Sequence, residues 1–459
     1  MNNRIVVIGG TAAGMSAAVK AKRLQPSLDI VVLERSGFIS YGSCGLPYFI
    51  GGMIESVEEL LSLTPETAAT RGIDVRVHHE AISINRITKM VTVKDIKSGK
   101  PYSIYYDSLV IATGAVPVIP PIPNIYAAGV YTLRTIEDGL ALRSLLDQRE
   151  VKRALIVGGG FIGLEMAEQL NLRGIDVSIL EALPRILPSF EEEYSSDIFE
   201  TLESKGVQVI CDQSLSEIEV KEGRVIAALS DKGLRFDVDL IIVSVGVRPN
   251  SDLAKASGLK IGFKGGIVVD AGLRTSDDSI WACGDCVQMR HLLTDREVYI
   301  PLGTTANKQG RITGGNIAGE KGSFTGVLGS QVAKVFDRYI ASTGLNLNAA
   351  ILAGFDAVSE KIVKSDRASY YPGGSNCSLC IIFDRINGRL LGAQGIGGFS
   401  LAGRVNTLAV AISSGLSIKQ LNEIDFVYAP PVAPVYDPIL IVASQGIKKI
   451  RQIELEISP

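Results

Sequence analysis

Two glycine-rich turns, each following a short apolar run and preceding a helix, constrain this chain more than any other feature. The turns begin at Gly9 and Gly158, and each unit continues into a second apolar strand that ends in an acid, Glu34 or Glu181. This order is that of a βαβ unit in which the turn holds a pyrophosphate and the acid binds a ribose hydroxyl. The sequence therefore predicts two separate dinucleotide-binding domains.

The two copies differ at one position. The second is a complete GxGxxG pattern through Gly160 and Gly163, whereas the first carries Thr11 in place of the middle glycine. Glu181 indicates NADH because a carboxylate repels a 2′-phosphate, although the nearby Arg185 would weaken that preference. An ordinary tight turn is the alternative for one copy alone, and a solvated strand end for Glu181; two copies with their acids favour the cofactor interpretation.

The composition excludes several classes of protein. With 459 residues, 46% of them hydrophobic, the chain can fill about three domains. A net charge of −3 without a basic block indicates no nucleic-acid or membrane partner. Apolar runs such as Leu240–Val243 are too short to cross a bilayer, and a strand-like run from Arg4 leaves no room for a signal peptide. Six cysteines do not form a disulfide framework in so long a chain, which indicates a cytoplasmic protein.

The first dinucleotide domain is predicted to be interrupted. A buried strand at Leu109–Ile111 precedes a proline-rich link at Pro117–Pro123, and the second unit then extends to Leu240–Asn250. The segment Ile280–Asp285 indicates a return to the first domain. From about Gly326 strands and helices follow without a glycine fingerprint, so we expect a third, interface domain.

Three further segments carry a resemblance to a known family. Ala112–Gly114, Gly246–Asn250 and Ala282–Asp285, together with the two turns, resemble the pyridine nucleotide–disulfide oxidoreductases over essentially the whole chain. The resemblance implies an α/β fold with two Rossmann-like domains, for FAD and NAD(P)H, and a C-terminal α+β dimerisation domain. The expected limits are 1–118 and 247–325 for the discontinuous FAD-binding domain, 119–246 for the NAD(P)H-binding domain and 326–459 for the dimerisation domain.

Other segments are similar to one branch of that family. Ser40–Tyr48, Tyr370–Gly373 and Tyr428–Pro431 resemble the coenzyme A-disulfide reductases, a branch that also contains NADH-dependent persulfide and sulfur reductases. The resemblance implies a homodimer that binds FAD, uses NADH with NADPH as an alternative, and takes coenzyme A as a substrate or bound ligand. It also implies an active site shared across the dimer interface.

The resemblance further implies which residues contact the cofactors. Asp285 matches the aspartate that binds the FAD ribityl chain, and Pro301–Ala306 begins a helix whose N-terminal dipole faces the flavin. The alternative for Asp285 is an ordinary turn residue at a strand end. The cofactor set is Gly9, Thr11, Ala12, Ala13, Gly14, Glu34, Arg35, Ser43, Thr113, Gly114, Gly158, Gly160, Ile162, Gly163, Glu181, Gly246, Gly284, Asp285, Pro301 and Thr304.

Cys44 is the predicted nucleophile. Dithiol members of the family carry a second cysteine five residues later, but that position is Phe49, so the chemistry is that of a single thiol alternating with a mixed disulfide or sulfenic acid. At a helix start beside a flavin, its pKa is expected to be lowered. Related oxidases and peroxidases have a histidine where this chain has Ala12, which disfavours oxygen or peroxide reduction. A buried packing cysteine is the alternative.

Two C-x-x-C pairs raise the alternative of a zinc site. They are Cys283 with Cys286, and Cys377 with Cys380. The first pair flanks a predicted FAD-binding turn, and the second spans three residues of a predicted strand, which places its members on opposite faces. We therefore expect no metal and assign all four cysteines to packing.

Substrate contacts are implied by the resemblance alone. Tyr370 and Tyr428 match tyrosines that reach the cysteine from the partner subunit, where a phenol can donate a proton to a leaving thiolate. Core packing is the alternative for both. Lys20 and Arg23 share one helix face, and a solvated cationic pair is the alternative there. The substrate-binding set is Ser16, Lys20, Arg23, Ser40, Ser43, Arg71, Asn307 and Tyr436.

Together, the residues and the resemblance predict an FAD-dependent oxidoreductase that passes electrons from NAD(P)H through flavin and Cys44 to a sulfur substrate. Coenzyme A disulfide is the first choice; coenzyme A persulfide, polysulfide or elemental sulfur, or an NADH oxidase activity, is the alternative. The chain ends at Pro459 without a rhodanese-like segment, which weakens the persulfide version slightly. A redox-responsive flavoprotein that acts by partner binding is the alternative from a different class.

Overall fold

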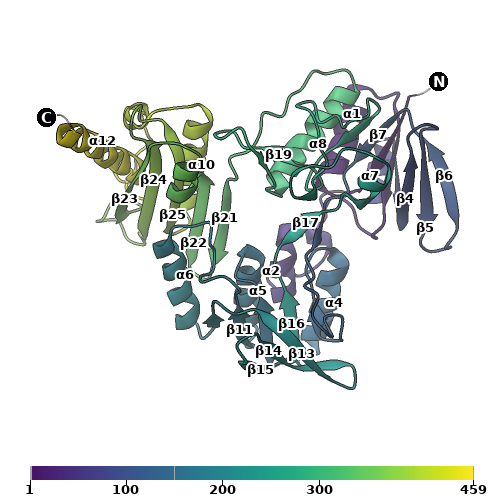
Figure 1. Cartoon of the computed structure of the whole chain (residues 1–459), viewed down its shortest axis with the longest axis horizontal. Coiled ribbons are helices and arrows are strands. Elements are labelled where there is room, and N and C mark those ends of the chain that lie inside the picture. Colours follow the sequence, from purple (N-terminus) through teal and green to yellow (C-terminus); the bar gives the residue numbers. More distant parts are fainter. Residues whose placement is uncertain (1–2, 149, 458–459) are drawn as a thin grey trace.

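The computed structural model describes residues 3–148 and 150–457, and three five-stranded sheets organise them into three lobes (Figure 1). Two of these sheets are parallel and the third is antiparallel. The two parallel sheets each contain one of the glycine turns, and the antiparallel sheet belongs to the C-terminal part of the chain.

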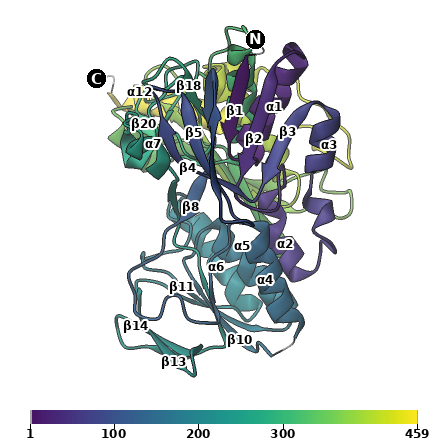
Figure 2. The same cartoon turned by 90° about the vertical axis from the view of Figure 1, so that its right-hand side faces the viewer.

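The first parallel sheet has the strand order β18-β7-β1-β2-β3, and Figure 2 shows β1, β2 and β3 side by side. Ile5 and Val7 pack against helices α1 and α8, whereas Val6 and Ile8 pack against the antiparallel ribbon β4-β5-β6. Burial on both faces explains why these strands are unbroken apolar runs. The bounds are β1 Arg4–Ile8, β2 Asp29–Glu34, β3 Ile73–Val77, β4 His79–Asn85, β5 Met90–Asp95, β6 Pro101–Tyr105, β7 Ser108–Ile111, β18 Ile280–Ala282, α1 Ala12–Leu24, α3 Pro65–Thr70, α7 Asp252–Ala256 and α8 Gly303–Ile317.

The second parallel sheet, of order β12-β11-β10-β16-β9, forms the lower lobe in Figure 1. Its core includes Ile156 of β10 and Leu164 of α5, and a separate ribbon, β13-β14-β15, packs on its other side through Leu155 and Ala228. The bounds are β9 Val130–Tyr131, β10 Arg153–Val157, β11 Asp176–Leu180, β12 Gln208–Ile210, β13 Leu215–Lys221, β14 Arg224–Ser230, β15 Arg235–Asp237, β16 Leu240–Val243, α4 Ile136–Asp147, α5 Phe161–Leu172 and α6 Glu192–Ser204.

The chain crosses twice between these two lobes, and the two crossings pair with each other. Strand β8, Ala115–Pro117, lies antiparallel to β17, Val247–Pro249. The predicted proline-rich link thus begins in an ordered two-stranded connection. This pairing fixes the outgoing and returning chain side by side.

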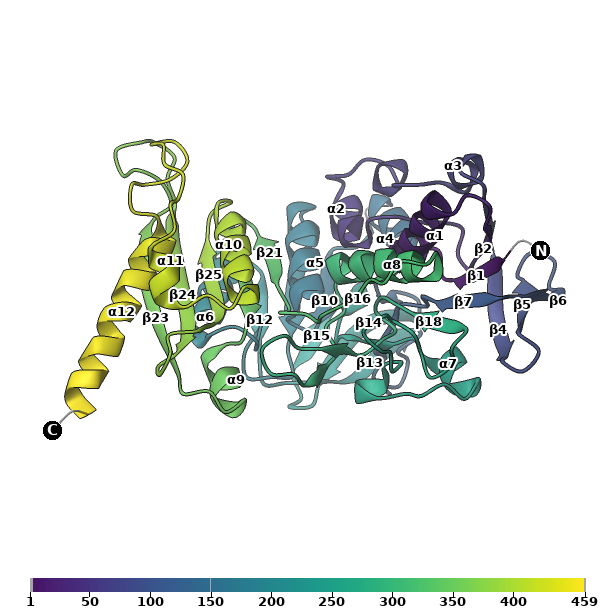
Figure 3. The same ribbon diagram turned by 90° about the horizontal axis from the view of Figure 1, so that it is seen from above.

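The C-terminal lobe contains the antiparallel sheet β21-β22-β25-β24-β23, with α10 and α12 on one side (Figure 3). Cys377 and Cys380 belong to different hydrophobic clusters, as expected for two residues three apart on one strand. The bounds are β21 Gln331–Val335, β22 Arg338–Gly344, β23 Ala357–Ser365, β24 Asn376–Asp384, β25 Leu390–Gly397, α9 Leu347–Leu352, α10 Leu401–Ser413, α11 Ile418–Asn422 and α12 Pro438–Ile457.

The architecture confirms the predicted fold class, with two parallel dinucleotide-type sheets and an antiparallel C-terminal domain. The segment around Ile280 returns to the first sheet as β18, beside β7. The precise domain limits stay a prediction. Among the helices of the described residues, none combines the length and apolar character needed to cross a membrane.

Candidate active site

The first glycine turn has the backbone of an anion cradle. Gly9 has φ +103°, and a Cβ there would lie 2.2 Å from the carbonyl oxygen of Ala112. A Cβ on Gly14 would lie 1.9 Å from the Gly9 carbonyl oxygen, so glycine is required for α1 to start this close to the turn. The Glu34 carboxylate accepts a 2.7 Å hydrogen bond from the Gly10 N–H. The turn, the uncapped helix start and the acid together fit a dinucleotide.

The second turn repeats this geometry. Gly158 has φ +111°, and a Cβ there would lie 2.6 Å from the Ser244 carbonyl oxygen. A Cβ on Gly163 would lie 2.1 Å from the Gly158 carbonyl oxygen. The Glu181 carboxylate is buried and accepts a 2.6 Å hydrogen bond from the Gly159 N–H. The residues present therefore fit a second dinucleotide in the same way.

The middle glycine and the nearby arginine of the second turn are less constrained by the fold. A Cβ on Gly160 would have no described atom within 4 Å apart from its chain neighbours. Arg185, expected to weaken the NADH preference, donates at 3.1 Å to the carbonyl oxygen of Phe190. The space beside Gly160 is therefore open to a ligand that binds at the turn. The Arg185 guanidinium is already hydrogen-bonded to the protein backbone.

Asp285 lies at the end of the first sheet beside an arginine that the sequence reasoning missed. Arg134 Nη2 lies 2.9 Å from Asp285 Oδ2, while Asp285 Oδ1 is buried and has no hydrogen-bond partner within residues 3–148 and 150–457. The Tyr299 hydroxyl is a second buried polar atom without a partner among the described residues, and burial, followed by the charge of Asp285, raises its pKa. Unpartnered buried polar atoms at a strand end fit the hydroxyl-rich ribityl chain of FAD.

The remaining predicted cofactor residues surround these features. Thr113 Oγ1 donates at 2.5 Å to the Asn250 carbonyl oxygen, at the paired crossing between the lobes. Gly114, Gly246 and Gly284 have positive φ, Arg35 is exposed directly after Glu34, Ala12, Ala13 and Ile162 lie in first turns of α1 and α5, and Pro301 and Thr304 flank the start of α8.

Cys44 lies in a one-turn 3-10 helix, Ser43–Gly45, directly before α2, Leu46–Gly51. Cys44 is open to solvent on one side, so a substrate can reach it, while protein surrounds its thiol on the other sides. A lowered pKa was predicted for this thiol beside a flavin, and the protein groups alone shift the pKa in the opposite direction. Burial by surrounding protein raises the pKa of the Cys44 thiol, and the charge of Glu165 raises it further, whereas Arg134 and the Ser43 hydroxyl oppose the shift.

Glu165, on α5 of the second lobe, is an acidic residue near Cys44 that the sequence reasoning did not identify. Burial, with the neighbouring charge of Glu168, raises the pKa of Glu165 to about 7, and a hydrogen bond with Tyr48 acts against this shift. The buried Glu168 carboxylate in turn lies 2.5 Å from Lys334 Nζ on β21 of the C-terminal lobe. The sequence did not point to Glu165, because an acid on a helix after a glycine turn is ordinarily solvated.

The two predicted catalytic tyrosines lie together, on loops of the C-terminal lobe. The hydroxyl oxygens of Tyr370 and Tyr428 are 3.2 Å apart, and both side chains are exposed. Their hydrogen bond raises the pKa of the Tyr428 phenol, so this phenol is neutral at neutral pH. Both rings are exposed, so neither tyrosine packs in the core of this chain. The loops that carry them project from the C-terminal lobe in Figure 3.

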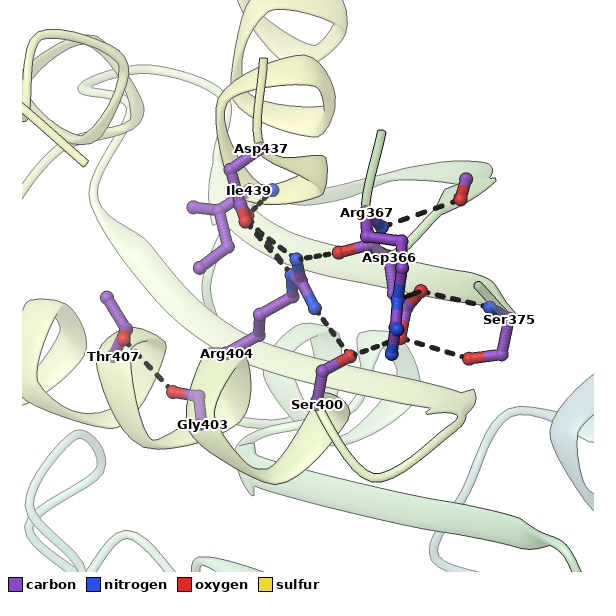
Figure 4. Close-up of polar contacts among 10 residues, drawn as sticks. Asp366, Arg367, Ser375, Ser400, Gly403, Arg404, Thr407, Asp437 and Ile439 are labelled. Carbon is purple, nitrogen blue, oxygen red and sulfur yellow. Dashed lines mark hydrogen bonds and ion pairs between the residues drawn. The ribbon is translucent and has the colours of Figure 1, made fainter. Parts of the chain in front are cut away.

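A buried polar cluster holds these two loops against each other (Figure 4). Arg404 of α10 lies 2.8 Å from Asp437, at the start of α12, and donates at 2.8 Å to the carbonyl oxygen of Asp366. The Asp366 carboxylate accepts from Ser375 and from Ser400. Because Asp366 precedes the loop with Tyr370 and Asp437 follows the loop with Tyr428, one arginine braces both.

The predicted substrate residues form one partial cluster. Ser16 Oγ donates to Asn307 Oδ1 at 2.7 Å, and Lys20, one turn further along α1, lies 2.8 Å from Glu320. Arg23 and Arg71 are exposed, and neither forms an ion pair within the described ranges. Ser40 and Ser43 lie in the segment that leads to Cys44, with φ +46° at Ser40, whereas Tyr436 is exposed on the loop before α12.

For the residues that the structure describes, no group of three or more His, Cys, Asp or Glu side chains is placed to hold a metal ion. Cys283 and Cys286 are fully buried, and Cys286 Sγ lies 3.3 Å from the Cys283 carbonyl oxygen. Burial raises the pKa of the Cys286 thiol to about 11, which suits a packing residue better than a thiolate ligand.

Comparison with known proteins agrees with this geometry. Residues 3–310 match the pyridine nucleotide-disulphide oxidoreductase family, and residues 330–437 match its dimerisation domain. The chain therefore belongs to the pyridine nucleotide-disulphide oxidoreductase family, and it is an FAD- and NAD(P)H-dependent enzyme. The resemblance inferred from the sequence is confirmed.

Three curated relatives show the branch. The chain is 37% identical to an NADH oxidase of Methanocaldococcus jannaschii, covering 97% of this chain and 99% of that one. It is 37% identical to an NAD(P)H coenzyme A polysulfide/persulfide reductase of Pyrococcus horikoshii, covering 96% and 98%. It is 30% identical to a coenzyme A disulfide reductase of Staphylococcus haemolyticus, covering 93% and 96%. The solved structure of reduced CoADR-RHD from Bacillus anthracis superposes with a TM-score of 0.95 at 33% identity, covering 98% of this chain and 81% of that one.

Proposed function

We propose that this chain acts as a homodimer that reduces the disulfide of coenzyme A with electrons from NADH. The observation that carries the proposal is the position of Cys44, whose thiol lies within the electrostatic reach of Asp285 from the first dinucleotide lobe and Glu165 from the second. A thiol placed where both cofactor lobes converge, and exposed to solvent, is suited to receive electrons and to meet a small substrate.

The sulfur chemistry needs one thiolate. The Cys44 thiolate attacks one sulfur of the disulfide, the original S–S bond breaks, and the first coenzyme A thiolate leaves from a Cys44–coenzyme A mixed disulfide. An electron pair then breaks that mixed disulfide, which restores the Cys44 thiolate and releases the second coenzyme A. When bound, FAD takes hydride from NADH and supplies this electron pair. The balance is one NADH, one proton and one disulfide consumed for two thiols and NAD⁺.

Each leaving thiolate needs a proton, and a tyrosine of the partner subunit is the proposed donor. Tyr428 is exposed and hydrogen-bonded to Tyr370, on loops braced by Arg404. Exposure of both rings on the dimerisation domain is consistent with their insertion into the site of a second copy. A neutral phenol can donate a hydrogen bond or a proton to a thiolate that develops nearby.

Coenzyme A persulfide or polysulfide is the second candidate substrate. The persulfide reductase relative is 37% identical to this chain, whereas the coenzyme A disulfide reductase relative is 30% identical. The same thiolate attack serves both substrates, since a persulfide also offers an electrophilic sulfur. Comparing the kcat/KM values of purified enzyme for coenzyme A disulfide and coenzyme A persulfide decides between them.

The experiment that tests the proposal replaces the nucleophile. The Cys44→Ser holoenzyme should still bind FAD and oxidise NADH in one flavin-reducing turnover, because neither step needs the thiol. It should lose coenzyme A disulfide reduction by about three orders of magnitude or more. The matched control is Cys211→Ser, a half-buried cysteine of the second lobe, which should retain activity. Retained activity in Cys44→Ser would overturn the assignment.

The shared site has its own test. Tyr428→Phe keeps the ring and removes only the hydroxyl, so it should slow sulfur reduction by about 10- to 1000-fold while flavin reduction by NADH continues. Mixing Cys44→Ser subunits with Tyr428→Phe subunits should restore activity, because each heterodimer then contains one site with both groups intact. Verified heterodimers no more active than either parent would show that Tyr428 acts within its own subunit or only supports the fold.

A further inference from the structure

Helices α1 and α8 are packed unusually closely along their length. A Cβ on Gly310 would lie 2.2 Å from the Ala13 carbonyl oxygen, and a Cβ on Gly314 would lie 2.2 Å from the Ala17 carbonyl oxygen. These contacts advance together along both helices, so α1 and α8 lie side by side and parallel. Polar side chains of α1 and α8 that flank this contact are therefore held close to one another.

Two polar bridges cross the exposed side of this contact. The first joins Ser16 to Asn307, and the second joins Lys20 Nζ to Glu320 Oε1 at 2.8 Å. Glu320 follows the end of α8, and its backbone N–H donates to the Gly315 carbonyl oxygen at 2.9 Å. The carboxylate is thus carried by an anchored backbone rather than by a free loop.

Lys20 differs from the other predicted substrate cations. Arg23 and Arg71 are exposed and form no ion pair within residues 3–148 and 150–457. The Lys20 side chain is only 18% exposed, against 46% for Glu320, and its charge is compensated by that carboxylate. An anionic ligand that uses these three cations meets two open ones and one that is already occupied.

We propose that Glu320 is a specificity-determining residue that competes with the phosphate of the ligand for Lys20. The inference rests on the proposed function and on the substrate-binding set implied by the resemblance, which includes Lys20, Arg23 and Arg71. A phosphate reaching Lys20 has to displace the Glu320 carboxylate, which remains close and repels it. The consequence is weaker retention of phosphate-bearing ligands, including the coenzyme A product, than the three cations alone would give.

This role predicts a gain of affinity on mutation. Glu320→Gln keeps the size of the side chain and removes its charge, so the KM for coenzyme A disulfide and the Kd for coenzyme A should both fall, by about 2- to 10-fold. Pantethine, the disulfide without phosphates, should show no such fall. A supporting role, in which Glu320 merely orients Lys20, predicts the opposite sign, because losing the carboxylate would then weaken binding.

The experiment measures Kd for coenzyme A by titration calorimetry on the FAD-loaded enzyme, with steady-state KM beside it. In a Lys20→Gln background, Glu320→Gln should lose most of its gain, since the two residues act through one contact. The matched control is Glu150→Gln, which removes the same charge from an exposed pair with Arg224, 3.3 Å apart, in the second lobe. It should leave coenzyme A affinity unchanged.

The outcomes separate this inference from the function on which it rests. Tighter coenzyme A binding in Glu320→Gln, absent in the Lys20→Gln background, supports it. Unchanged or weaker binding, an equal gain in Glu150→Gln, an equal gain with pantethine, or no coenzyme A binding by any variant would overturn it. That same gain in coenzyme A affinity, found in an enzyme that reduces neither the disulfide nor the persulfide of coenzyme A, would overturn the proposed function and leave the competition at Lys20 supported.

Discussion

The two glycine turns share a backbone and differ in their middle residue. In both, the first glycine has positive φ next to a neighbouring carbonyl group, and the last glycine lies against the carbonyl oxygen of the first. In both, a buried glutamate accepts from the N–H that follows the first glycine. The middle position is Thr11 in one turn and Gly160 in the other.

The difference shows which glycines belong to the fold. At Gly14 and Gly163 a methyl group would meet backbone, so no neighbouring side chain can yield to it. At Gly160 no described atom lies within 4 Å of an added Cβ apart from chain neighbours, and at the matching position the chain carries Thr11. The backbone of the turn therefore requires glycine at the outer positions. At the middle position the fold accepts a side chain, so a bound ligand can determine which residue is suitable there.

The largest expected effect comes from the outer glycines. Gly14→Ala places a Cβ against the Gly9 carbonyl oxygen and should cost about 3 kcal/mol or more of unfolding free energy, with loss of FAD. Gly163→Ala should damage the second turn instead, so that FAD is kept and reduction by NADH is lost. Flavin absorbance and rapid-mixing reduction measure the two outcomes. Full flavin content in Gly14→Ala would contradict the claim that the first turn requires glycine at this position.

The second effect concerns Glu165 of the second lobe and has a defined sign with pH. Burial raises its pKa from 4.5 to about 7, so the stabilising protonated state is lost as pH rises through 7. Glu165→Gln should therefore raise the unfolding free energy by about 1–3 kcal/mol at pH 8 and change it little at pH 4. Thermal melts of the holoenzyme at both pH values measure this. An equal gain at pH 4 would show that the charge is not the cause.

The same substitution has a second readout at Cys44. Ionised Glu165 is one of the causes that raise the pKa of the Cys44 thiol. Glu165→Gln should therefore shift the pH profile of Cys44 alkylation by iodoacetamide toward lower pH. Glu150→Gln, in the same lobe and exposed, is the matched control and should leave the alkylation profile in place.

The third effect concerns Glu181, the acid that follows the second glycine turn, and the preference for NADH over NADPH. Glu181→Ala removes the carboxylate that disfavours a 2′-phosphate, so the preference for NADH over NADPH should relax by about 1–3 kcal/mol of discrimination. Arg185→Ala should change the preference less, because that guanidinium is already bonded to a backbone carbonyl. The kcat/KM values for both nucleotides measure the preference. Equal values for the unmodified enzyme would refute the argument from Glu181.

The smallest effect on stability is expected at the middle glycine. Gly160→Ala adds a Cβ where the fold has space, so unfolding free energy should change by less than about 0.5 kcal/mol. The KM for NADH should nevertheless rise several-fold if the nucleotide occupies that space. Urea unfolding and initial rates separate the two quantities. A large loss of stability would mean that the fold, and not the ligand, requires this glycine.

Much of the fold was predictable because it depends on local patterns. The glycine turns, the acids at Glu34 and Glu181 and the return near Ile280 each need only a few neighbouring residues to be recognised, and the fold class and family were confirmed. The roles assigned to single site residues stay predictions. Among the protein groups alone, burial and then the charge of Glu165 raise the pKa of the Cys44 thiol, and neither is visible in the sequence.

The residues that were missed share one property. Arg134, Glu165, Glu320 and Arg404 each act on a partner more than 30 residues away in the chain or carried by a different element, so no spacing marks them. A charged residue in a loop or helix is ordinarily solvated, and the sequence therefore favoured that interpretation. Only the packing of distant elements distinguishes these four from the many exposed charges.

The sequence by itself determined the local features of the chain. It showed where glycine allows a turn to approach a helix start, and which strands are apolar on both faces. It also showed that Cys44 has no second cysteine five residues later. These follow from sterics and burial, which operate over short stretches of chain. Tertiary structure alone decided the electrostatics. Lys20 is paired with Glu320, 300 residues further along the chain, and the charges that act on Cys44 come from Glu165 and Arg134 on other elements. Coulomb interactions depend on distance and burial, which only the packing of these elements sets.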